Sequence, residues 1–190
     1  MGLLDGKVAI ITGAGGGLGE AYAKLFAREG AAGEHLAGAI DAAGADKGAR
    51  FMQLCDAHDI PLVFLADTPG IMVGPEVEKT AIVRHCCRLF VTGANLTIPH
   101  FTVVLRKGYG LGAQAMAGGS FKEPFFAMAW PTGEFGGMGL EGQVKLGFRN
   151  ELAAIEDPVQ RLARYQDLVA RAYERGKALN YGVGFGVDDV

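Results

Sequence analysis

Residues 101–119 read FTVVLRKGYGLGAQAMAGG, an apolar run followed by a glycine-rich stretch and then by small residues. The apolar run predicts a buried strand, and the glycines at 108–112 predict a tight turn that leads into a short helix. The first N–H groups of a helix have no partner inside the helix and lie at its positive end. Gly110, Leu111 and Gly112 are therefore candidate backbone donors to a group on which negative charge develops.

Strand-like and helix-like patterns alternate along most of the chain. Apolar runs bounded by Gly or Pro predict strands, and apolar residues at spacings of three and four predict helices. Their alternation predicts an α/β fold. The glycine-rich tail at 181–190 is expected to be loosely held. Strands are predicted at 61–66, 101–105 and 125–130, helices at 46–58, 76–93, 113–117, 140–150 and 158–178, and loops at 67–75 and 131–139.

The N-terminal segment carries a separate nucleotide-binding pattern. Residues 7–29 predict a strand, a glycine turn and a helix, with Gly13, Gly17 and Gly19 in the turn. This pattern resembles the start of the short-chain dehydrogenase/reductase family. The resemblance implies a Rossmann-like strand–loop–helix unit whose glycines let the backbone approach a pyrophosphate.

The rest of the dehydrogenase chemistry does not follow this pattern. That family needs a second strand next, and residues 31–36 do not form one. It also needs a Tyr-x-x-x-Lys pair with a serine shortly before it. Tyr173 and Lys177 fit the pair, but Ser120, the only serine, lies more than fifty residues upstream. We therefore expect the three glycines to be a vestigial motif, residues 1–33 to be a structural segment, and NAD(P) not to be a cofactor.

Two alternative functions stay open at this point. One is a fragment of an NAD(P)-dependent dehydrogenase, and the other is a non-catalytic product of gene fusion or misassembled sequence. The second alternative arises because two specific patterns meet at a break in the strand pattern, near residues 33 and 34. The sequence also leaves open whether residues 8–11 enter the sheet as a substitute strand.

Six short motifs follow one another through the remainder of the chain. They are GAID at 38–41, DKGARF at 46–51, LCD at 54–56, DTPG at 67–70, RKGYG at 106–110 and WPTGEFGG at 130–137. With these motifs, residues 35–190 resemble the carboxyltransferase (β) subunit of biotin-dependent acyl-CoA carboxylases of the propionyl-CoA and methylmalonyl-CoA type.

The resemblance implies a crotonase-like fold, of which such a subunit has two copies. Residues 34–190 would be most of the second copy, the C-terminal domain that accepts biotin, without its opening strands. The implied activity is carboxyl transfer from carboxybiotin to an acyl-CoA. The implied cofactor is biotin on a carrier protein or domain, and the implied partners are an acyl-CoA and full carboxyltransferase subunits in an oligomer. Because the acyl-CoA domain is missing, the chain is expected to be inactive alone.

The resemblance also assigns site residues. The amides that stabilise the biotin oxyanion map to Leu111 and Gly112, next to Gly110. Gln114 lies near a position that influences acyl selectivity, and Asp67-Thr68-Pro69-Gly70 is expected to line the substrate cleft. Asp-x-x-Gly after a strand also occurs in GTPases, but the chain has no Gly-x-x-x-x-Gly-Lys-Ser/Thr motif.

Composition excludes several other classes of function. The formal net charge is −3 and the basic residues are scattered, so neither nucleic acid nor an anionic membrane surface is an expected partner. No apolar run approaches the ~20 residues of a membrane span, and a cytoplasmic location is the default expectation. His85, Cys86 and Cys87 are adjacent on a predicted helix and cannot converge on one ion, so no metal site is expected.

Overall fold

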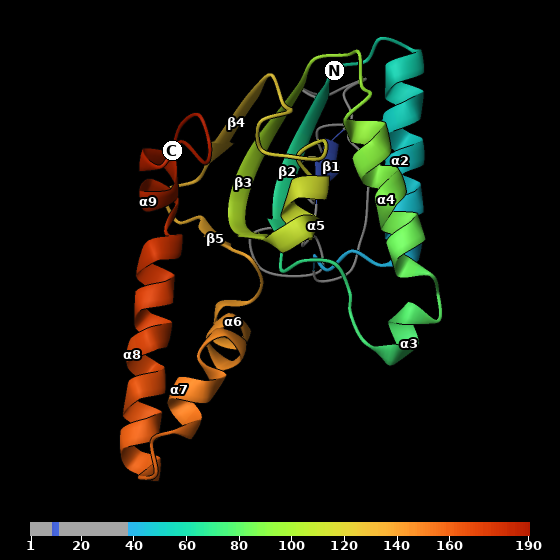
Figure 1. Cartoon of the computed structure of the whole chain (residues 1–190). Coiled ribbons are helices and arrows are strands. Elements are labelled where there is room, and N and C mark those ends of the chain that lie inside the picture. The colour runs from blue at the N-terminus through green and yellow to red at the C-terminus, as the bar shows by residue number, and fades with distance from the viewer. Residues whose placement is uncertain (1–8, 12–37) are drawn as a thin grey trace.

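The computed structural model describes residues 9–11 and 38–190, and the chain forms a parallel sheet with helices packed on it (Figure 1). The predicted α/β fold is therefore confirmed. Gly13, Gly17 and Gly19 lie outside the described residues. The strands are β1 (Ala9–Ile11), β2 (Leu62–Thr68), β3 (His100–Tyr109), β4 (Phe126–Ala129) and β5 (Glu134–Gly136).

The strand order is β1-β2-β3-β4, all parallel, and β5 pairs with the end of β3. The N-terminal strand does enter the sheet: Ala9 is opposite Val63 and Ile11 is opposite Leu65. Of the residues 8–11 that the sequence left open, residues 9–11 therefore form a strand of the sheet, and residue 8 lies outside the described residues.

Helices α2 (Ala42–Ala57), α4 (Ile82–Gly93) and α5 (Gly110–Ala115) form one core with the sheet. α2 and α4 lie side by side, and α5 contacts β2, β3 and α4 (Figure 1). α2 begins four residues before the predicted helix at 46–58, because the Asp41 carboxylate caps it. The Gly44 N–H donates to Asp41 Oδ1 at 2.6 Å. The largest fully buried side chains include Phe64, Met52, Leu62, Ile82 and Val104.

The predicted helix at 76–93 is wrong, since the structure divides it. α3 (Pro75–Glu78) ends before α4, and Ala81 between them adopts a left-handed conformation with φ 55°. The hydroxyl of Thr80 donates to the Val77 carbonyl at 2.6 Å, and the Thr80 N–H donates to the same oxygen at 3.0 Å. A local side-chain bond of this kind competes with continued helix.

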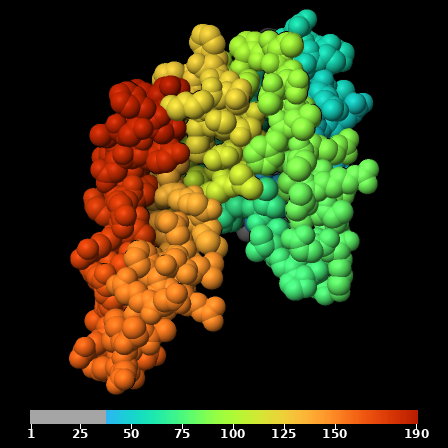
Figure 2. Space-filling model, in the orientation of Figure 1, coloured from blue at the N-terminus to red at the C-terminus, as the bar shows by residue number. Residues whose placement is uncertain are grey.

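The predicted helix at 140–150 is also divided, into α6 (Leu140–Gly147) and α7 (Arg149–Ala153). α8 (Pro158–Gly176) ends two residues before the prediction, and α9 (Ala178–Val183) follows it. We call α6, α7 and α8 the arm, because they extend away from the sheet (Figure 1). In the space-filling view, an open notch separates the arm from α3 (Figure 2).

The strands also depart from their predicted bounds. β2 and β3 continue to Thr68 and Tyr109, beyond the predicted 61–66 and 101–105. β5 lies inside the predicted loop at 131–139, where it pairs with β3.

The prediction of a loosely held tail is wrong. Val187 is only 2% exposed, and the Asp188 N–H donates to the Ala127 carbonyl at 2.7 Å. The Ala127 N–H in turn donates to Asp188 Oδ2 at 2.7 Å, and the Ala129 N–H donates to the Asp189 carbonyl at 3.0 Å. The tail therefore covers the edge of β4, which would otherwise present unpaired backbone groups.

Candidate functional site

The predicted site residues lie at the carboxyl ends of neighbouring parallel strands. β2 ends at Thr68 and β3 ends at Tyr109, and the predicted residues lie at the end of β2 and directly after the two strands. Ligands of parallel α/β sheets bind outside the carboxyl ends of the strands. The topology therefore places the candidates where a ligand site is expected.

Gly110, Leu111 and Gly112 form the first turn of α5, so the helix begins three residues earlier than predicted. Tyr109 is extended and belongs to β3, and Gly110 follows it with φ +57°. The strand thus passes directly into the helix without an intervening loop. The N–H groups of this turn are those that lack partners within a helix.

Glycine at these positions permits close backbone contacts. A Cβ on Gly112 would lie 2.5 Å from the carbonyl carbon of Gly70, and a Cβ on Gly110 would lie 2.6 Å from the Gly137 oxygen. The structure therefore brings Gly70 and the start of α5 together, as expected for residues of one site. It adds Gly137, which the sequence did not single out as a site residue.

Thr68 holds the turn that leads to Gly70. Its buried hydroxyl accepts the Gly70 N–H at 3.1 Å and donates to the Gly70 carbonyl at 3.2 Å. The same carbonyl accepts the Ile40 N–H at 3.0 Å. Gly70 has φ +130°, a conformation that other residues rarely adopt, and Pro69 beside it is exposed. Thr68 and Gly70 thus fix the turn, and contact of this turn with a substrate stays a prediction.

Asp67 is directed into the protein. Its carboxylate is 1% exposed and receives the Lys107 N–H at 3.1 Å and the Arg106 guanidinium at 3.1 Å. β3 bulges there, because Ala66 pairs with Val104 while Thr68 pairs with Gly108. The Asp67 carboxylate satisfies polar groups that the bulge takes out of the ladder. Its predicted role as a substrate-binding residue is not tested by this arrangement.

Leu111 and Gln114 are both exposed on α5, three residues apart and so on one helical face. Leu111 is 61% exposed, which leaves the first turn of α5 open to solvent beside that side chain. Within residues 38–190, Gln114, which lies near the position predicted to influence acyl selectivity, is exposed.

Sequence reasoning missed a buried hydrogen bond behind this turn. The Tyr109 hydroxyl donates to Glu134 Oε2 at 2.8 Å, and Tyr109 is 3% exposed. Burial, and then the Glu134 carboxylate, raise the pKa of Tyr109 above its ordinary range. Both residues stand in motifs recognised in the sequence, RKGYG and WPTGEFGG, but the pairing of β3 with β5 is needed to join them.

The residues of the dehydrogenase alternative are engaged elsewhere. The Tyr173 hydroxyl donates to Glu141 Oε1 at 2.7 Å, and Lys177 pairs with Glu174 at 2.6 Å. The Glu141 hydrogen bond and burial raise the pKa of Tyr173 to about 12. A tyrosine that serves as a proton donor and acceptor near neutral pH needs the opposite shift. This arrangement does not favour a dehydrogenase.

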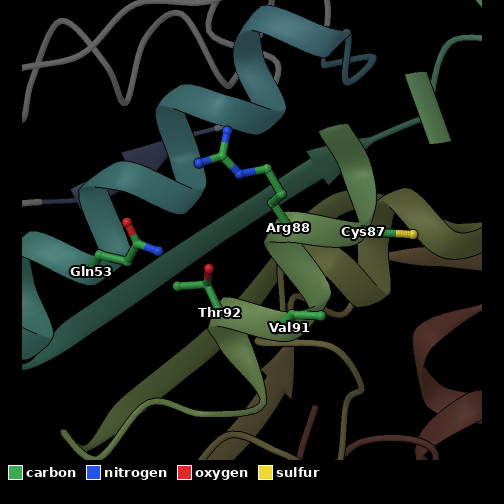
Figure 3. A pocket seen from close by; sticks show the side chains of 5 residues that line it. All are labelled: Gln53, Cys87, Arg88, Val91 and Thr92. Atoms are coloured by element: carbon green, nitrogen blue, oxygen red, sulfur yellow. The ribbon is translucent and has the colours of Figure 1, made fainter. Parts of the chain in front are cut away.

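A hollow of about 260 Å³ is lined by residues of α2 and α4 (Figure 3). It contains none of the predicted site residues. Arg88 at its edge is held by Asp46 at 2.8 Å, and the same carboxylate lies 2.7 Å from His85 Nδ1. The hollow is lined by Gln53, Cys87, Arg88, Val91 and Thr92.

Two kinds of feature are absent from the residues that the structure describes. His, Cys, Asp and Glu side chains nowhere gather there in a group of three or more that could hold a metal ion. Along the same part of the chain, no helix combines the length and apolar character needed to cross a membrane.

Known proteins resemble the chain in sequence and in structure. The sequence matches the carboxyl transferase domain over residues 7–181. It is 36% identical, over 141 residues, to the propionyl-CoA carboxylase carboxyltransferase subunit of Haloferax mediterranei, covering 72% of this chain and 27% of that protein. Since the match begins at residue 7, inside the segment 1–33, the domain boundary near residues 33 and 34 stays a prediction.

Two solved structures share the fold. A single-chain, multi-domain long-chain acyl-CoA carboxylase is 54% identical, with a TM-score of 0.70 over 82% of this chain and 15% of that one. The transcarboxylase 12S structure with methylmalonyl-CoA and methylmalonic acid bound is 33% identical, with a TM-score of 0.73 over 81% of this chain and 29% of that one.

The chain spans less than a third of the length of the curated relatives it matches. Within that span, its parallel sheet and covering helices are the crotonase-like fold of the carboxyltransferases. By sequence match and by fold, the chain belongs to the carboxyl transferase domain family.

Proposed function

We propose that the chain is the biotin-accepting half of an acyl-CoA carboxylase carboxyltransferase. The observation that carries the proposal is the meeting of Gly70, Gly137 and the first turn of α5 at the carboxyl ends of β2, β3 and β5. In a member of the carboxyl transferase domain family, this turn is the place where the sequence resemblance puts the oxyanion donors.

The backbone of α5 is suited to the chemistry. When carboxybiotin gives up its carboxyl group, negative charge develops on the ureido oxygen. The N–H groups of Leu111 and Gly112 would donate to that oxygen, and they are held in place by the helix before any charge develops. One preorganised donor of this kind contributes roughly 3–4 kcal/mol to transition-state stabilisation. The residues present fit the group, because the first turn carries two glycines and an exposed Leu111.

The acyl-CoA half would come from another polypeptide or domain. Relatives are more than three times as long as the matched span, and the transcarboxylase 12S structure is a hexamer with methylmalonyl-CoA bound. We infer that this chain works in an oligomer with complete carboxyltransferase subunits and with biotin on a carrier protein. Gln114, on the exposed face of α5, would then lie near the acyl group, and Asp67–Gly70 would line the cleft. The acyl chain length stays open.

The test is a titration of the ¹⁵N-labelled chain with free biotin, followed by the amide resonances of residues 110–112. Lipoic acid is the control ligand, since it has a similar acid side chain but no ureido oxygen. We expect biotin to shift these resonances in a saturable way and lipoic acid to leave them in place. Shifts that occur only elsewhere, or equal shifts with both compounds, would contradict the proposal.

Catalysis is tested separately from binding. The chain alone, given carboxybiotin and propionyl-CoA, is expected to transfer no carboxyl group, because it spans less than a third of its relatives. Added to a carboxyltransferase subunit whose own oxyanion turn has been inactivated, it is expected to restore transfer.

The alternatives make different predictions. Saturable binding of NADH at micromolar concentration would favour the dehydrogenase fragment. A chain without a cooperative thermal unfolding transition would favour the non-catalytic fusion, for which the origin of residues 1–33 stays a prediction. A cytoplasmic location also remains an expectation from the sequence.

A further inference from the structure

The hydrogen bond between Tyr109 and Glu134 lies immediately behind the proposed oxyanion turn. Tyr109 is the last residue of β3 and precedes the first residue of α5, and its ring is buried in the fold. Its hydroxyl has one acceptor described in the structure, Glu134 Oε2 at 2.8 Å. A movement of the Tyr109 side chain would be passed to Gly110 through the backbone, because no loop intervenes.

β5 contacts the same junction through its backbone. Tyr109 pairs with Gly136 in the parallel ladder, and Lys107 pairs with Glu134. Gly137 is the first residue after β5, and a Cβ on Gly110 would lie 2.6 Å from its oxygen. Ladder pairing, the side-chain hydrogen bond and the close glycine contact therefore hold β5 against the start of α5 at three points.

We propose that Glu134 is a positioning residue, which holds Tyr109 and thereby sets the direction of the Leu111 and Gly112 amides. The inference rests on the proposed function of those amides. Oxyanion donors act at 2.7–3.1 Å from the charged oxygen, so a small rotation of the first helical turn weakens them. The Glu134 carboxylate is half-buried, which makes its hydrogen bond with Tyr109 stronger than an exposed bond of the same length.

The chain contains a matched control pair. Tyr173 on α8 donates to Glu141 on α6 at 2.7 Å, which is nearly the same length as the Tyr109–Glu134 bond. The control pair lies on the arm and is exposed. Its loss tests the effect of breaking an exposed Tyr–Glu hydrogen bond that leaves the Tyr109–Glu134 hydrogen bond intact, although Tyr173 also acts electrostatically on Tyr109.

The experiment compares Tyr109→Phe, Glu134→Ala, Glu134→Gln and Tyr173→Phe in the full chain, with free biotin as the probe. Amide resonances and hydrogen exchange of residues 110–112 are measured without ligand, and the dissociation constant is measured by titration. We expect Tyr109→Phe and Glu134→Ala to shift these resonances, speed their exchange and weaken biotin binding roughly five- to tenfold, the effect of losing one hydrogen bond. Glu134→Gln keeps an acceptor oxygen and should stay within about twofold of the original affinity.

The possible outcomes separate the two proposals. If Tyr109→Phe and Glu134→Ala bind biotin as the unmodified chain does, and residues 110–112 keep their resonances, the positioning role is wrong and the proposed function stands. If Tyr173→Phe moves the same resonances, the effect is a general loss of stability and the positioning role is again wrong. If the unmodified chain does not bind biotin, the proposed function fails, and the resonances of residues 110–112 alone decide whether Glu134 positions them. Tyr109→Phe keeps the buried ring, so this variant still tests the positioning role if Glu134→Ala does not fold.

Discussion

The sheet with its helices and the arm bury their side chains to very different extents. α2 buries Ala45, Ala49, Met52 and Cys55 within 16 residues, whereas α8 buries only Leu168 and Gly176 within 19. Burial of apolar surface is the dominant favourable term in folding. The sheet and its helices, which we call the body (residues 9–11 and 38–136), therefore hold most of the folding free energy, and the proposed site is built on them.

The arm buries a few apolar side chains, Leu140, Val144 and Leu168, and carries several polar contacts on its surface. Arg164 pairs with Glu151 and with Asp167, each at 2.8 Å, and Tyr173 bonds to Glu141. Exposed pairs of this kind each contribute little to stability and are weakened by salt. Helices of similar length therefore pack into the core in the body, whereas in the arm they bury few side chains.

The largest expected difference comes from removing one large apolar side chain from each region. Phe64 in β2 is fully buried, and Phe64→Ala should lower the free energy of unfolding by about 3–5 kcal/mol. Leu162 on α8 is 56% exposed, and Leu162→Ala should change it by less than about 0.5 kcal/mol. Urea unfolding of the two variants measures both values. Comparable losses would mean that the arm is packed as tightly as the body.

A smaller effect is expected from adding a single methyl group. A Cβ on Gly93, at the end of α4, would lie 2.5 Å from backbone atoms of Gly118. Gly93→Ala should therefore cost about 1–3 kcal/mol, because two backbones must separate. On α6, a Cβ on Gly142 would meet only Met138 Cε, at 3.8 Å. Gly142→Ala should instead stabilise the chain by up to about 1 kcal/mol through helix propensity.

Thermal unfolding of these two alanine variants gives the sign of each change directly. Stabilisation by both substitutions would show that the body can yield at the Gly93–Gly118 contact, and the contrast between the regions would be weaker than the structure indicates.

The sequence predicted the local elements better than the contacts between them. The strand at 101–105 was found because its apolar run is contained in one short window, whereas the predicted turn at 108–112 is divided between the end of β3 and the first turn of α5. The helices at 46–58 and 158–178 were found for the same reason, since their apolar spacing is local. Each error at their ends is a few residues, and the largest, the early start of α2, is explained by the side-chain cap of Asp41.

The features that were missed depend on residues far apart in the chain. β5 has three residues and exists because it pairs with the end of β3, some 27 residues earlier (Lys107 with Glu134). The sequence showed Glu134 only as a member of the WPTGEFGG motif. Its hydrogen bond with Tyr109 could not be predicted without the pairing of β5 with β3. The site glycines were recognisable from the sequence, but their close contact with Gly70 and Gly137 is a property of the fold.

The docked tail allows a third, smaller test of the body. Asp188→Ala removes the carboxylate that accepts the Ala127 N–H on β4, and it should cost about 1 kcal/mol. Asp189→Ala is the matched control. Within residues 38–190 the Asp189 side chain accepts only the neighbouring Val190 N–H, and its backbone carbonyl stays paired with Ala129. Differential scanning calorimetry should show a lower Tm for the first variant alone. Equal Tm values would restore the expectation of a loosely held tail.

The smallest expected effect is a difference in pH response between the two regions. His100 in β3 is buried against Phe64, with ring centroids 5.8 Å apart. Burial lowers the pKa of His100, against smaller opposing effects of the Ile98 carbonyl and Glu123. The unfolded chain takes up a proton near the ordinary value of about 6.5, while the folded chain resists it, so stability falls as the pH drops from 7.5 to 5.5.

The arm responds in a different pH range. The Tyr173 hydrogen bond lowers the pKa of Glu141, and Lys177 lowers the pKa of Glu174. The stability that these carboxylates contribute is therefore present above their ordinary pKa near 4.5 and is lost only as the pH falls below it. Between pH 7.5 and 5.5 the loss of stability should therefore originate in the body. His100→Gln should flatten the dependence of Tm on pH in this interval, while Glu141→Gln should leave its slope unchanged. If the Tm of His100→Gln depends on pH as steeply as that of the original chain, His100 takes up its proton as readily in the folded chain as in the unfolded one. The body would then tolerate a charge on the buried ring.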